Sequence, residues 1–509
     1  MAVEMIDIVK RYPNVMANDH SSLLVEQGEI HGLIGENGAG KSTMMNILYG
    51  LAKPDSGQVK VFGQPVRINH SPQLAIDLGI SMVHQHFMLM PDLTALQNII
   101  LGRAPTKLGV INRAAATEKI ERIMQDYGLQ VDLSAKVYQL SVGQMQQLEI
   151  IKALYRNAKI IALDEPTAVL TPNETDRLME VLLRLKGQGK SIIFISHKLR
   201  EVMAITDRIT VMRKGIVTGR VAKGETKPQE LSTLMVGRQV DLALGREEFS
   251  PGEVVLEVSK LSGLNQRGLV ALNEVSFSVR KGEIVGIAGV EGNGQTELSE
   301  AISGLLKPIG GSVKLHGRDV TYQSVRQRRN MGLGHVPEDR LKVGTAKNRT
   351  IMENLIMNRY CQPPYAKRGI MDSKSLLALA EGMLGQFKIK TPSSLLALSS
   401  LSGGNMQKVV LTREIETEPD LLIAAQPTRG VDIGAIEDIH RTLLSLRDAG
   451  KGILLISAEL DEILSLSDRI LIMYEGEIVA ELGRDEANEK LIGQYMTGAK
   501  KEGVAGGKA

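Results

Sequence analysis

Residues 28–57, GEIHGLIGENGAGKSTMMNILYGLAKPDSG, decide the fold of this chain, because they return at residues 282–311 as GEIVGIAGVEGNGQTELSEAISGLLKPIGG. A second segment repeats as well: LSVGQMQQ, which starts at Leu140, returns as LSGGNMQK at Leu401. The two offsets are 254 and 261 residues, so only a few insertions separate the halves. A period of this length is far longer than the unit of a solenoid, and it therefore indicates a duplicated domain.

The repeat predicts four segments: a first domain at 1–236, a linker at 237–252, a second domain at 253–498 and a disordered tail at 499–509. In each half, short aliphatic runs alternate with helical stretches, which is typical of an α/β domain with a mainly parallel sheet. We therefore expect two tandem α/β domains. Residues 91–139 have helical spacing and few strand signals, and they predict a helical subdomain inserted in the first domain.

The glycine-rich part of residues 28–57 lies between two expected elements. Residues 29–34 predict a strand, and residues 41–51 predict a helix. Four apolar side chains of that helix share one face by their spacing: Met44, Ile47, Leu48 and Leu51. The glycines thus form a loop between a strand and a helix.

Composition excludes several classes of protein. With 509 residues, 43% hydrophobic and 23% charged, the chain is an ordinary globular protein of more than one domain. A formal charge of +3 and 3% aromatic residues give no case for binding nucleic acid. No run approaches the roughly 18 apolar residues of a membrane span. The start lacks the apolar run of a signal peptide, and Cys361 is the single cysteine, so we expect a cytosolic compartment.

Residues 35–42, GENGAGKS, match the phosphate loop G-x-x-x-x-G-K-S/T, and they stand between the strand and the helix that this motif requires. The glycines let backbone N–H groups surround phosphate oxygens at the positive end of the helix. Lys41 adds a positive charge for the β- and γ-phosphates, and Ser42 is a ligand for Mg²⁺. The match predicts a site for a nucleoside triphosphate.

Two adjacent carboxylates, Asp164 and Glu165, end the buried run IIALDEP. The carboxyl ends of strands form the ligand side of an open α/β sheet. Asp164 is therefore a candidate to hold Mg²⁺ through water, and Glu165 a candidate general base for the attacking water. An ordinary helix start would also give Asp-Glu-Pro, but the neighbouring phosphate loop favours the catalytic interpretation.

Taken together, these motifs resemble the nucleotide-binding domain of ATP-binding cassette (ABC) proteins. The segments that carry the resemblance are GENGAGKST, SMVHQHF, LSVGQMQQ, LDEPTAVLT and ISHKL, and the second half repeats their order. The resemblance covers nearly the whole chain. It implies two tandem phosphate-loop NTPase domains of the ABC type, each with a helical subdomain, which bind ATP and Mg²⁺ as an intrachain pseudo-dimer.

The resemblance also assigns roles to single residues. The catalytic group is Glu165, His197, Gln85 and Lys41. The nucleotide-binding group is Tyr12, Gly35, Glu36, Asn37, Gly38, Ala39, Gly40, Lys41, Ser42, Thr43, Ser402, Gly404 and Asp432, and the metal group is Ser42, Gln85 and Asp164. In this assignment Tyr12 stacks on adenine, His197 contacts the γ-phosphate, and Gln85 contacts Mg²⁺ and the attacking water near the membrane partner. A half-buried tyrosine at a strand end is the rival interpretation of Tyr12.

The second half has lost these chemical groups. The residues at the positions of Lys41, Asp164, Glu165 and His197 are Gln295, Ala425, Gln426 and Ala458. Gln85 aligns with Glu338, and Tyr12 with Gln266. Charge-assisted hydrogen bonds are worth roughly 1.5–3 kcal/mol each, so the loss of two would weaken nucleotide binding by about a hundredfold or more. We expect the second site to be structural or to bind nucleotide without turnover.

The LSGGQ-like signature segments also differ between the halves, but here the second half is closer to the family pattern than the first. The second half has LSGGN from Leu401, whereas Val142 replaces a glycine in the first. In ABC proteins the signature of one domain serves the ATP on the phosphate loop of the other, so Ser402 and Gly404 are expected to serve the intact loop. Thr171 departs from the family, which has an aspartate there, and the second half keeps it as Asp432.

Without a membrane span, such an ATPase would act through partners. The family resemblance favours the energising subunit of a bacterial importer on the cytoplasmic face of the membrane, with two permease subunits and, indirectly, an extracytoplasmic solute-binding protein. Segments such as LLIAAQPTRGVD look more like nucleoside importers than simple-sugar importers, which remain the alternative. A ribosome-acting tandem ATPase is less favoured, because those chains have two intact sites. Residues 86–94 and 340–345 are candidate permease contacts.

Overall fold

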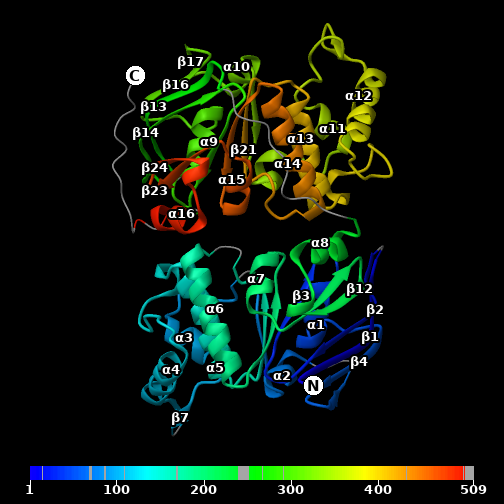
Figure 1. Ribbon diagram of the computed structural model, residues 1–509, viewed down its shortest axis with the longest axis vertical. Helices are drawn as coiled ribbons and strands as arrows, with labels where there is room; N and C mark the ends of the chain where they lie inside the picture. Colours follow the sequence, from blue (N-terminus) through cyan, green and yellow to red (C-terminus); the bar gives the residue numbers. More distant parts are fainter. Residues whose placement is uncertain are drawn as a thin grey trace. The chain divides into compact units, whose positions relative to one another are not determined.

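A computed structural model describes residues 1–13, 15–67, 71–84, 87–107, 109–167, 170–238, 251–265, 267–290, 292–431, 433–496 and 498. The chain divides into two compact units, Met1–Val240 and Asp241–Ala509 (Figure 1). The predicted tail and most of the predicted linker lie outside the described residues.

The first unit contains two sheets. The smaller is antiparallel, in the order β2-β1-β4-β5. Its strands are β1 (Val3–Tyr12), β2 (Val15–Val25), β4 (Ser56–Val61) and β5 (Gln64–Val66). Alternate side chains at the start of β1, Val3 and Met5, are fully buried, as expected for a strand with one face against a core.

The larger sheet carries the predicted site. Its order is β12-β11-β3-β10-β9-β6, and all neighbours are parallel except β12, which is antiparallel to β11. The strands are β3 (Ile30–Gly35), β6 (Ile80–Val83), β9 (Ile160–Asp164), β10 (Ser191–Ile195), β11 (Arg208–Arg213) and β12 (Ile216–Ala222). The strands β3 and β10 are buried at every position, because helices and the smaller sheet cover both faces. The mainly parallel α/β sheet that the sequence predicts is confirmed.

Helix α1 (Lys41–Tyr49) follows β3 directly after the glycine loop. Met44, Ile47 and Leu48 are buried in the core between the two sheets, as predicted. Leu51 is not on this face: the helix ends at Tyr49 because Gly50 adopts the left-handed conformation of a C-cap, and Leu51 is 54% exposed.

A helical subdomain is inserted between β6 and β9, two strands that are neighbours in the sheet. It consists of α3 (Ala95–Ile100), α4 (Arg113–Tyr127) and α5 (Val142–Tyr155), and both α3 and α4 pack on α5. Beyond the prediction, it also contains a hairpin of two very short strands, β7 (Thr106–Lys107) and β8 (Val110–Ile111). The other helices of the unit are α2 (Pro72–Asp77), α6 (Pro172–Gly187), α7 (Leu199–Ile205) and α8 (Pro228–Val236).

The second unit repeats both sheets in the same order. The smaller sheet is β14-β13-β16-β17 and the larger is β24-β23-β15-β22-β21-β18. The strands are β13 (Val254–Leu264), β14 (Val270–Arg280), β15 (Ile284–Ala288), β16 (Gly310–Leu315), β17 (Arg318–Asp319), β18 (Leu333–Val336), β21 (Leu421–Ala425), β22 (Gly452–Ser457), β23 (Arg469–Tyr474) and β24 (Glu477–Gly483). Duplication of the fold is therefore complete, even where the chemistry differs.

The helices of the second unit follow the same plan. They are α9 (Gln295–Ser303), α10 (Val325–Asn330), α11 (Ile351–Ile356), α12 (Ser373–Gln386), α13 (Gly403–Ile415), α14 (Ile433–Asp448), α15 (Leu460–Leu466) and α16 (Glu489–Met496). The insertion between β18 and β21 holds α11, α12 and α13 around its own apolar core, with a hairpin of β19 (Ala366–Lys367) and β20 (Ile370–Met371). After β18, residues Arg340–Gly344 form one turn of π-helix.

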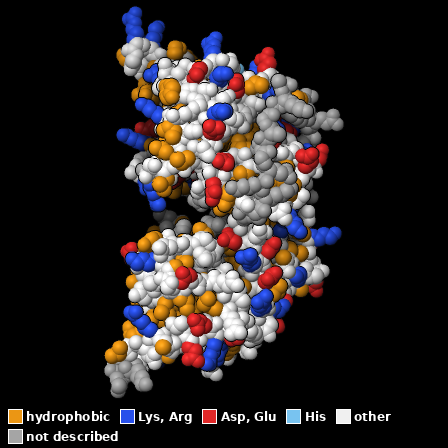
Figure 2. Space-filling view, turned by 90° about the vertical axis from the view of Figure 1, so that its left-hand side faces the viewer, with side chains coloured by type: hydrophobic (Ala, Val, Ile, Leu, Met, Phe, Trp, Pro, Cys, Tyr) orange, Lys and Arg blue, Asp and Glu red, His pale blue; other side chains and the backbone are white. Residues whose placement is uncertain are grey.

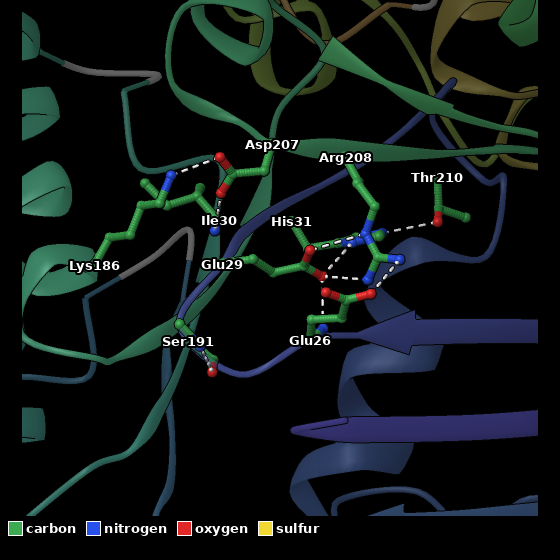
Figure 3. A network of polar contacts seen from close by, with 10 residues as sticks. Glu26, Glu29, Ile30, His31, Lys186, Ser191, Asp207, Arg208 and Thr210 are labelled. Carbon is green, nitrogen blue, oxygen red and sulfur yellow. Dashed lines mark hydrogen bonds and ion pairs between the residues drawn. The ribbon is translucent and has the colours of Figure 1, made fainter.

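A buried polar network fixes the amino ends of the first unit's central strands, at the opposite end of β3 from the glycine loop (Figure 3). The Glu29 carboxylate accepts hydrogen bonds from Arg208 Nε at 2.8 Å and Nη2 at 2.9 Å, and lies 3.0 Å from His31 Nδ1. Burial alone would raise the pKa of Glu29, but the hydrogen bonds from His31 and Arg208 lower it to about 2. This carboxylate is therefore ionised at every ordinary pH.

The surface carries charges of both signs. Figure 2 shows basic, acidic and hydrophobic side chains interspersed on the face that it presents, over both units. Over the residues that the structure describes, no helix combines the length and the apolar character needed to cross a membrane.

Candidate ATP site

The loop between β3 and α1 is shaped by glycines with positive φ. Gly38 has a φ of 79° and Gly40 a φ of 99°. A Cβ atom on Gly40 would lie 2.2 Å from the carbonyl oxygen of Ala17, so the backbone of β2 leaves room for glycine alone. The turn presents the first N–H groups of α1 at the carboxyl edge of the sheet, which is a ready site for phosphate.

Lys41 is the first residue of α1, and only 6% of it is exposed. Its Nζ atom donates hydrogen bonds to the carbonyl oxygens of Gly35, at 2.7 Å, and Glu36, at 3.0 Å. Burial lowers the pKa of Lys41, whereas the nearby carboxylates of Glu165 and Asp164 oppose this shift. The ammonium group is thus held across the loop where phosphate oxygens would bind.

Ser42 and Asp164 come together from opposite elements, as the sequence predicts. The Ser42 hydroxyl, in the first turn of α1, donates a hydrogen bond to Oδ2 of Asp164, the last residue of β9, at 3.3 Å. Burial raises the pKa of Asp164, and the adjacent Glu165 raises it further. A hydroxyl and a carboxylate are oxygen ligands of the kind that Mg²⁺ takes beside phosphate oxygens.

Glu165 and His197 form the second pair of the site. Oε1 of Glu165 lies 3.0 Å from Nδ1 of His197, which follows β10. Glu165 adopts a positive φ of 47°, and its backbone N–H donates to the carbonyl of Ile195 at 2.9 Å. Burial would raise the pKa of Glu165, but the hydrogen bond and charge of His197, with the charge of Lys41, lower it overall. The carboxylate is ionised and able to accept a proton.

The remaining predicted residues of the first unit have simpler environments. Glu36 and Asn37 lie in the turn of the loop, Ala39 is buried and Thr43 is partly buried in α1. Tyr12 ends β1 and is 42% exposed, with Lys10 Nζ 5.2 Å from the centroid of its ring. Three of the expected residues lie outside the described part of the chain: Gln85, Gln266 and Asp432.

Sequence reasoning missed His84, which directly follows the last residue of β6. Its ring packs edge-on against Tyr49, with the ring centroids 6.2 Å apart. Its charge acts on the carboxyl of Asp164, while burial lowers the pKa of His84 itself. Its position one residue before Gln85 is the signal that could have found it.

The second unit keeps the loop but not its charge. Gly294 has a φ of 100°, and a Cβ atom there would lie 2.2 Å from the carbonyl oxygen of Ala271, as at Gly40. Gln295 replaces the lysine: it is 5% exposed, and its Nε2 atom has no hydrogen-bond partner within the structure. The backbone cradle is thus retained without its cation.

The end of β21 in the second unit carries no carboxylate. Ala425 ends β21, and Gln426 follows with a φ of 48°, the conformation of Glu165. Oε1 of Gln426 accepts a hydrogen bond from the backbone N–H of Ala458 at 3.2 Å. An amide at this position cannot take a proton from water, so Gln426 cannot act as a general base.

The signature helices are capped in both units. Ser402 caps α13, accepting from the N–H of Asn405 at 3.4 Å, and Gly404 is buried in the first turn. In the first unit Ser141 caps α5, and Val142 opens that helix with 37% exposure. Thr171, where the family has an aspartate, caps α6 and exchanges hydrogen bonds with Glu174.

Fold and motifs together define a tandem phosphate-loop ATPase. The model of the ABC transporter family matches residues 19–168 and 272–429, which is more than half of the chain. The chain belongs to the ABC transporter family and is an ATPase of that family, as predicted.

Curated relatives match over nearly the full length. The chain is 46% identical to the guanosine import ATP-binding protein NupO of Bacillus subtilis, covering 99% of both chains. It is 46% identical to the nucleoside import ATP-binding protein NupA of Lactococcus lactis (97% of this chain, 98% of the relative) and 45% identical to the glucose import ATP-binding protein TsgD13 of Haloferax volcanii (97% and 96%).

The match to one of the solved structures covers both units. It is to a chain of the complex between an archaeal ribosomal stalk protein and the archaeal ribosome recycling factor aABCE1, with a TM-score of 0.64, 19% identity, and coverage of 95% of this chain and 92% of that chain. At this identity the likeness shows the fold alone.

Proposed function

We propose that this chain hydrolyses ATP to energise a bacterial importer of nucleosides. The observation that carries the ATPase part is the meeting of Lys41, Ser42, Asp164, Glu165 and His197 at one edge of the first unit's sheet. The full-length similarity to nucleoside import proteins supports the solute class. In this proposal the chain binds permease subunits at the cytoplasmic face of the cell membrane, and a solute-binding protein outside delivers the solute.

The residues present fit ATP with Mg²⁺. Among the described residues no three or more His, Cys, Asp or Glu gather as a metal cage, which agrees with a cation shared between one carboxylate and substrate phosphates. In our proposal Ser42, Asp164 and Gln85 hold Mg²⁺, which neutralises charge on the β- and γ-phosphates when bound. Lys41 binds the same phosphates, and Tyr12 stacks on adenine.

The reaction follows from the Glu165 and His197 pair. The ionised Glu165 accepts a proton from water as the water oxygen attacks the γ-phosphorus, and the bond from that phosphorus to the β–γ bridging oxygen breaks, giving ADP and phosphate. His197 fixes the orientation of Glu165 through Nδ1, and donation by Nε2 to a γ-phosphate oxygen as well requires the imidazolium form, which has an N–H on both ring nitrogens. Lys41 balances the charge that develops on the leaving oxygen.

For the second unit we propose a supporting role. Its residues at the four catalytic positions supply neither the cation, the metal ligand nor the base that hydrolysis requires. These residues are Gln295, Ala425, Gln426 and Ala458. We assign Ser402, Gly404 and Asp432 to the ATP bound by the first unit, as the family resemblance implies. We retain domain bounds of 1–236 and 253–498, and residues 86–94 and 340–345 as permease contacts.

A simple-sugar importer is the second candidate, because the glucose import relative is nearly as similar as the nucleoside ones. Deleting the gene and measuring uptake of labelled guanosine, adenosine, ribose, galactose and glucose separates the two. We expect nucleoside uptake to be lost and to return with the wild-type gene, but not with Glu165→Gln. Loss of sugar uptake alone would reject the nucleoside assignment and leave the ATPase assignment standing.

A further inference from the structure

Glu338 joins two segments of the second unit. Its Oε2 atom accepts a hydrogen bond from the hydroxyl of Thr296, in the first turn of α9, at 2.7 Å. Its Oε1 atom accepts from Nη1 of Arg429, in the loop between β21 and α14, at 2.7 Å. One carboxylate thus ties the glycine loop of this unit to the loop that leads into α14.

The same contact in the first unit is made differently. Thr296 stands at the position of Ser42, whose hydroxyl donates to Asp164 at the end of β9. In the second unit the equivalent strand ends in Ala425, and the carboxylate comes instead from the end of the neighbouring strand β18. The hydroxyl has kept a carboxylate partner, but that carboxylate is now paired with an arginine.

Arg340, two residues further on, holds the same loop by its backbone. Its guanidinium donates to the carbonyl oxygens of Arg429, at 2.5 Å, and Gly430, at 3.3 Å. The π-helical turn that begins at Arg340 is capped by Asp339, whose Oδ1 atom accepts hydrogen bonds from the N–H groups of Leu341 and Lys342, each at 3.0 Å. Side chain and backbone of the loop are therefore both fixed.

Arg340 also lies close to the first glycine of the second signature, Gly403. A Cβ atom on Gly403 would lie 3.0 Å from Nη2 of Arg340 and 3.1 Å from the carbonyl oxygen of Gly430. Such contacts are too close for a side chain unless the neighbours move. In the first unit Phe87 aligns with Arg340, and Val142 is accommodated in place of the glycine. Gly403 therefore leaves room for the guanidinium of Arg340.

Charge at the second glycine loop opposes a nucleotide. Gln295 brings no cation, and Glu297 stands at the position of Thr43. A cavity of about 290 Å³ beside the start of α9 is lined by Glu297 and Glu300 against the single guanidinium of Arg267. The carboxylates of Glu297 and Glu338 act on Glu300, in addition to its burial. A triphosphate placed here would meet several negative charges within the range of strong repulsion.

We propose that Glu338 is an internal substitute for nucleotide in the second unit. Its carboxylate holds the Thr296 hydroxyl and the Arg429 guanidinium together, and with Arg340 it keeps the signature segment assembled while the second loop is empty. The chain then binds one ATP, on the first loop. The inference rests on the proposed function of the first site, since the assembled signature acts on that ATP.

The first test is the number of nucleotides that bind. Equilibrium dialysis of radiolabelled ATP with the full-length Glu165→Gln chain, with Mg²⁺ and separately with EDTA, should give one ATP per chain in Mg²⁺. The further change Lys41→Ala should reduce it to less than a tenth. A second ATP of comparable affinity, in either condition, would overturn the proposal. No ATP at all would instead overturn the proposed function.

The second test concerns the positioning role and uses the permease complex. We expect Glu338→Ala and Arg429→Ala each to lower kcat for ATP at least fivefold, while KM changes less than twofold and the stoichiometry of ATP stays at one. Glu257→Ala, which removes an exposed ion pair with Lys314 elsewhere in the unit, is the matched control and should leave both unchanged. Unchanged kcat in folded Glu338→Ala and Arg429→Ala variants would overturn the proposal.

Discussion

Replacing Glu165 by glutamine isolates the proton transfer from everything else that this residue does. The second unit shows the outcome in advance, because Gln426 holds the same positive φ, 48° against 47°, and its amide oxygen still accepts a hydrogen bond at 3.2 Å. In the variant, His197 Nδ1 can donate to the amide oxygen as it does to the carboxylate. Fold and orientation should therefore survive, and only the proton acceptor is lost.

The size of the effect follows from that single loss. A positioned general base contributes about a hundredfold to ten-thousandfold in rate, which corresponds to about 3–5 kcal/mol in the activation barrier. ATP binding should not weaken, because removing a negative charge near Lys41 reduces repulsion of the phosphates. We expect kcat to fall by at least a hundredfold, with the dissociation constant for ATP unchanged or lower.

Phosphate release by the permease complex in steady state measures kcat, and thermal unfolding of the chain checks the fold. Glu174→Gln, which changes a carboxylate at the cap of α6, is the control for the loss of one charge in the same unit. More than a tenth of wild-type activity in a correctly folded Glu165→Gln chain would refute the assignment of the base.

Three further predictions concern single features of the units. Restoring two carboxylates in the second unit with Ala425→Asp and Gln426→Glu should raise phosphate release by less than twofold, since the lysine is still missing; a larger gain would show that the second site had lacked only these groups. Gly40→Ala should destabilise the chain by at least about 1–3 kcal/mol in denaturant unfolding, because of its contact with a backbone carbonyl, whereas Gly38→Ala, which has open space, should cost less; equal losses would contradict the steric argument. Because the pKa of Glu29 is lowered to about 2 from 4.5, its stabilising effect is complete above about pH 4.5 and is lost as the pH falls towards 2; Glu29→Gln should be less stable at pH 7 and show a flatter acid dependence of the unfolding free energy.

The sequence was sufficient for the site wherever its geometry follows from the sheet. Parallel strands place their carboxyl ends at one edge, so Ser42 and Asp164 could be expected to lie close together, whereas the place of His197 in the site followed from the family resemblance. Gly50 is the sequence signal for the end of α1, and it outweighs the apolar spacing that continues to Leu51.

Contacts between distant side chains could not be predicted in this way. Glu338 and Arg429 are separated by 91 residues and meet only because β18 pairs with β21 in one register. Arg340 begins a π-helical turn, which has no strong sequence signal, and from there its side chain donates to the carbonyls of Arg429 and Gly430. The hydrogen bond from the Lys41 ammonium to the carbonyl of its own loop also depends on local packing, which the spacing of residues in the sequence does not encode.

Gly40 and Gly294 make the same close approach to a neighbouring backbone, although the chemistry of their loops has diverged. The approach is made by the carbonyls of Ala17 and Ala271, each on the second strand of its unit, and involves no ligand. After duplication the lysine, the aspartate and the base could therefore be replaced without a steric conflict. A side chain in place of this glycine would instead clash with the backbone of the smaller sheet. A glycine-rich loop in a duplicated domain thus records ancestry and tight backbone contact, and it becomes evidence for a working ATPase only when the charged residue beside it has also survived.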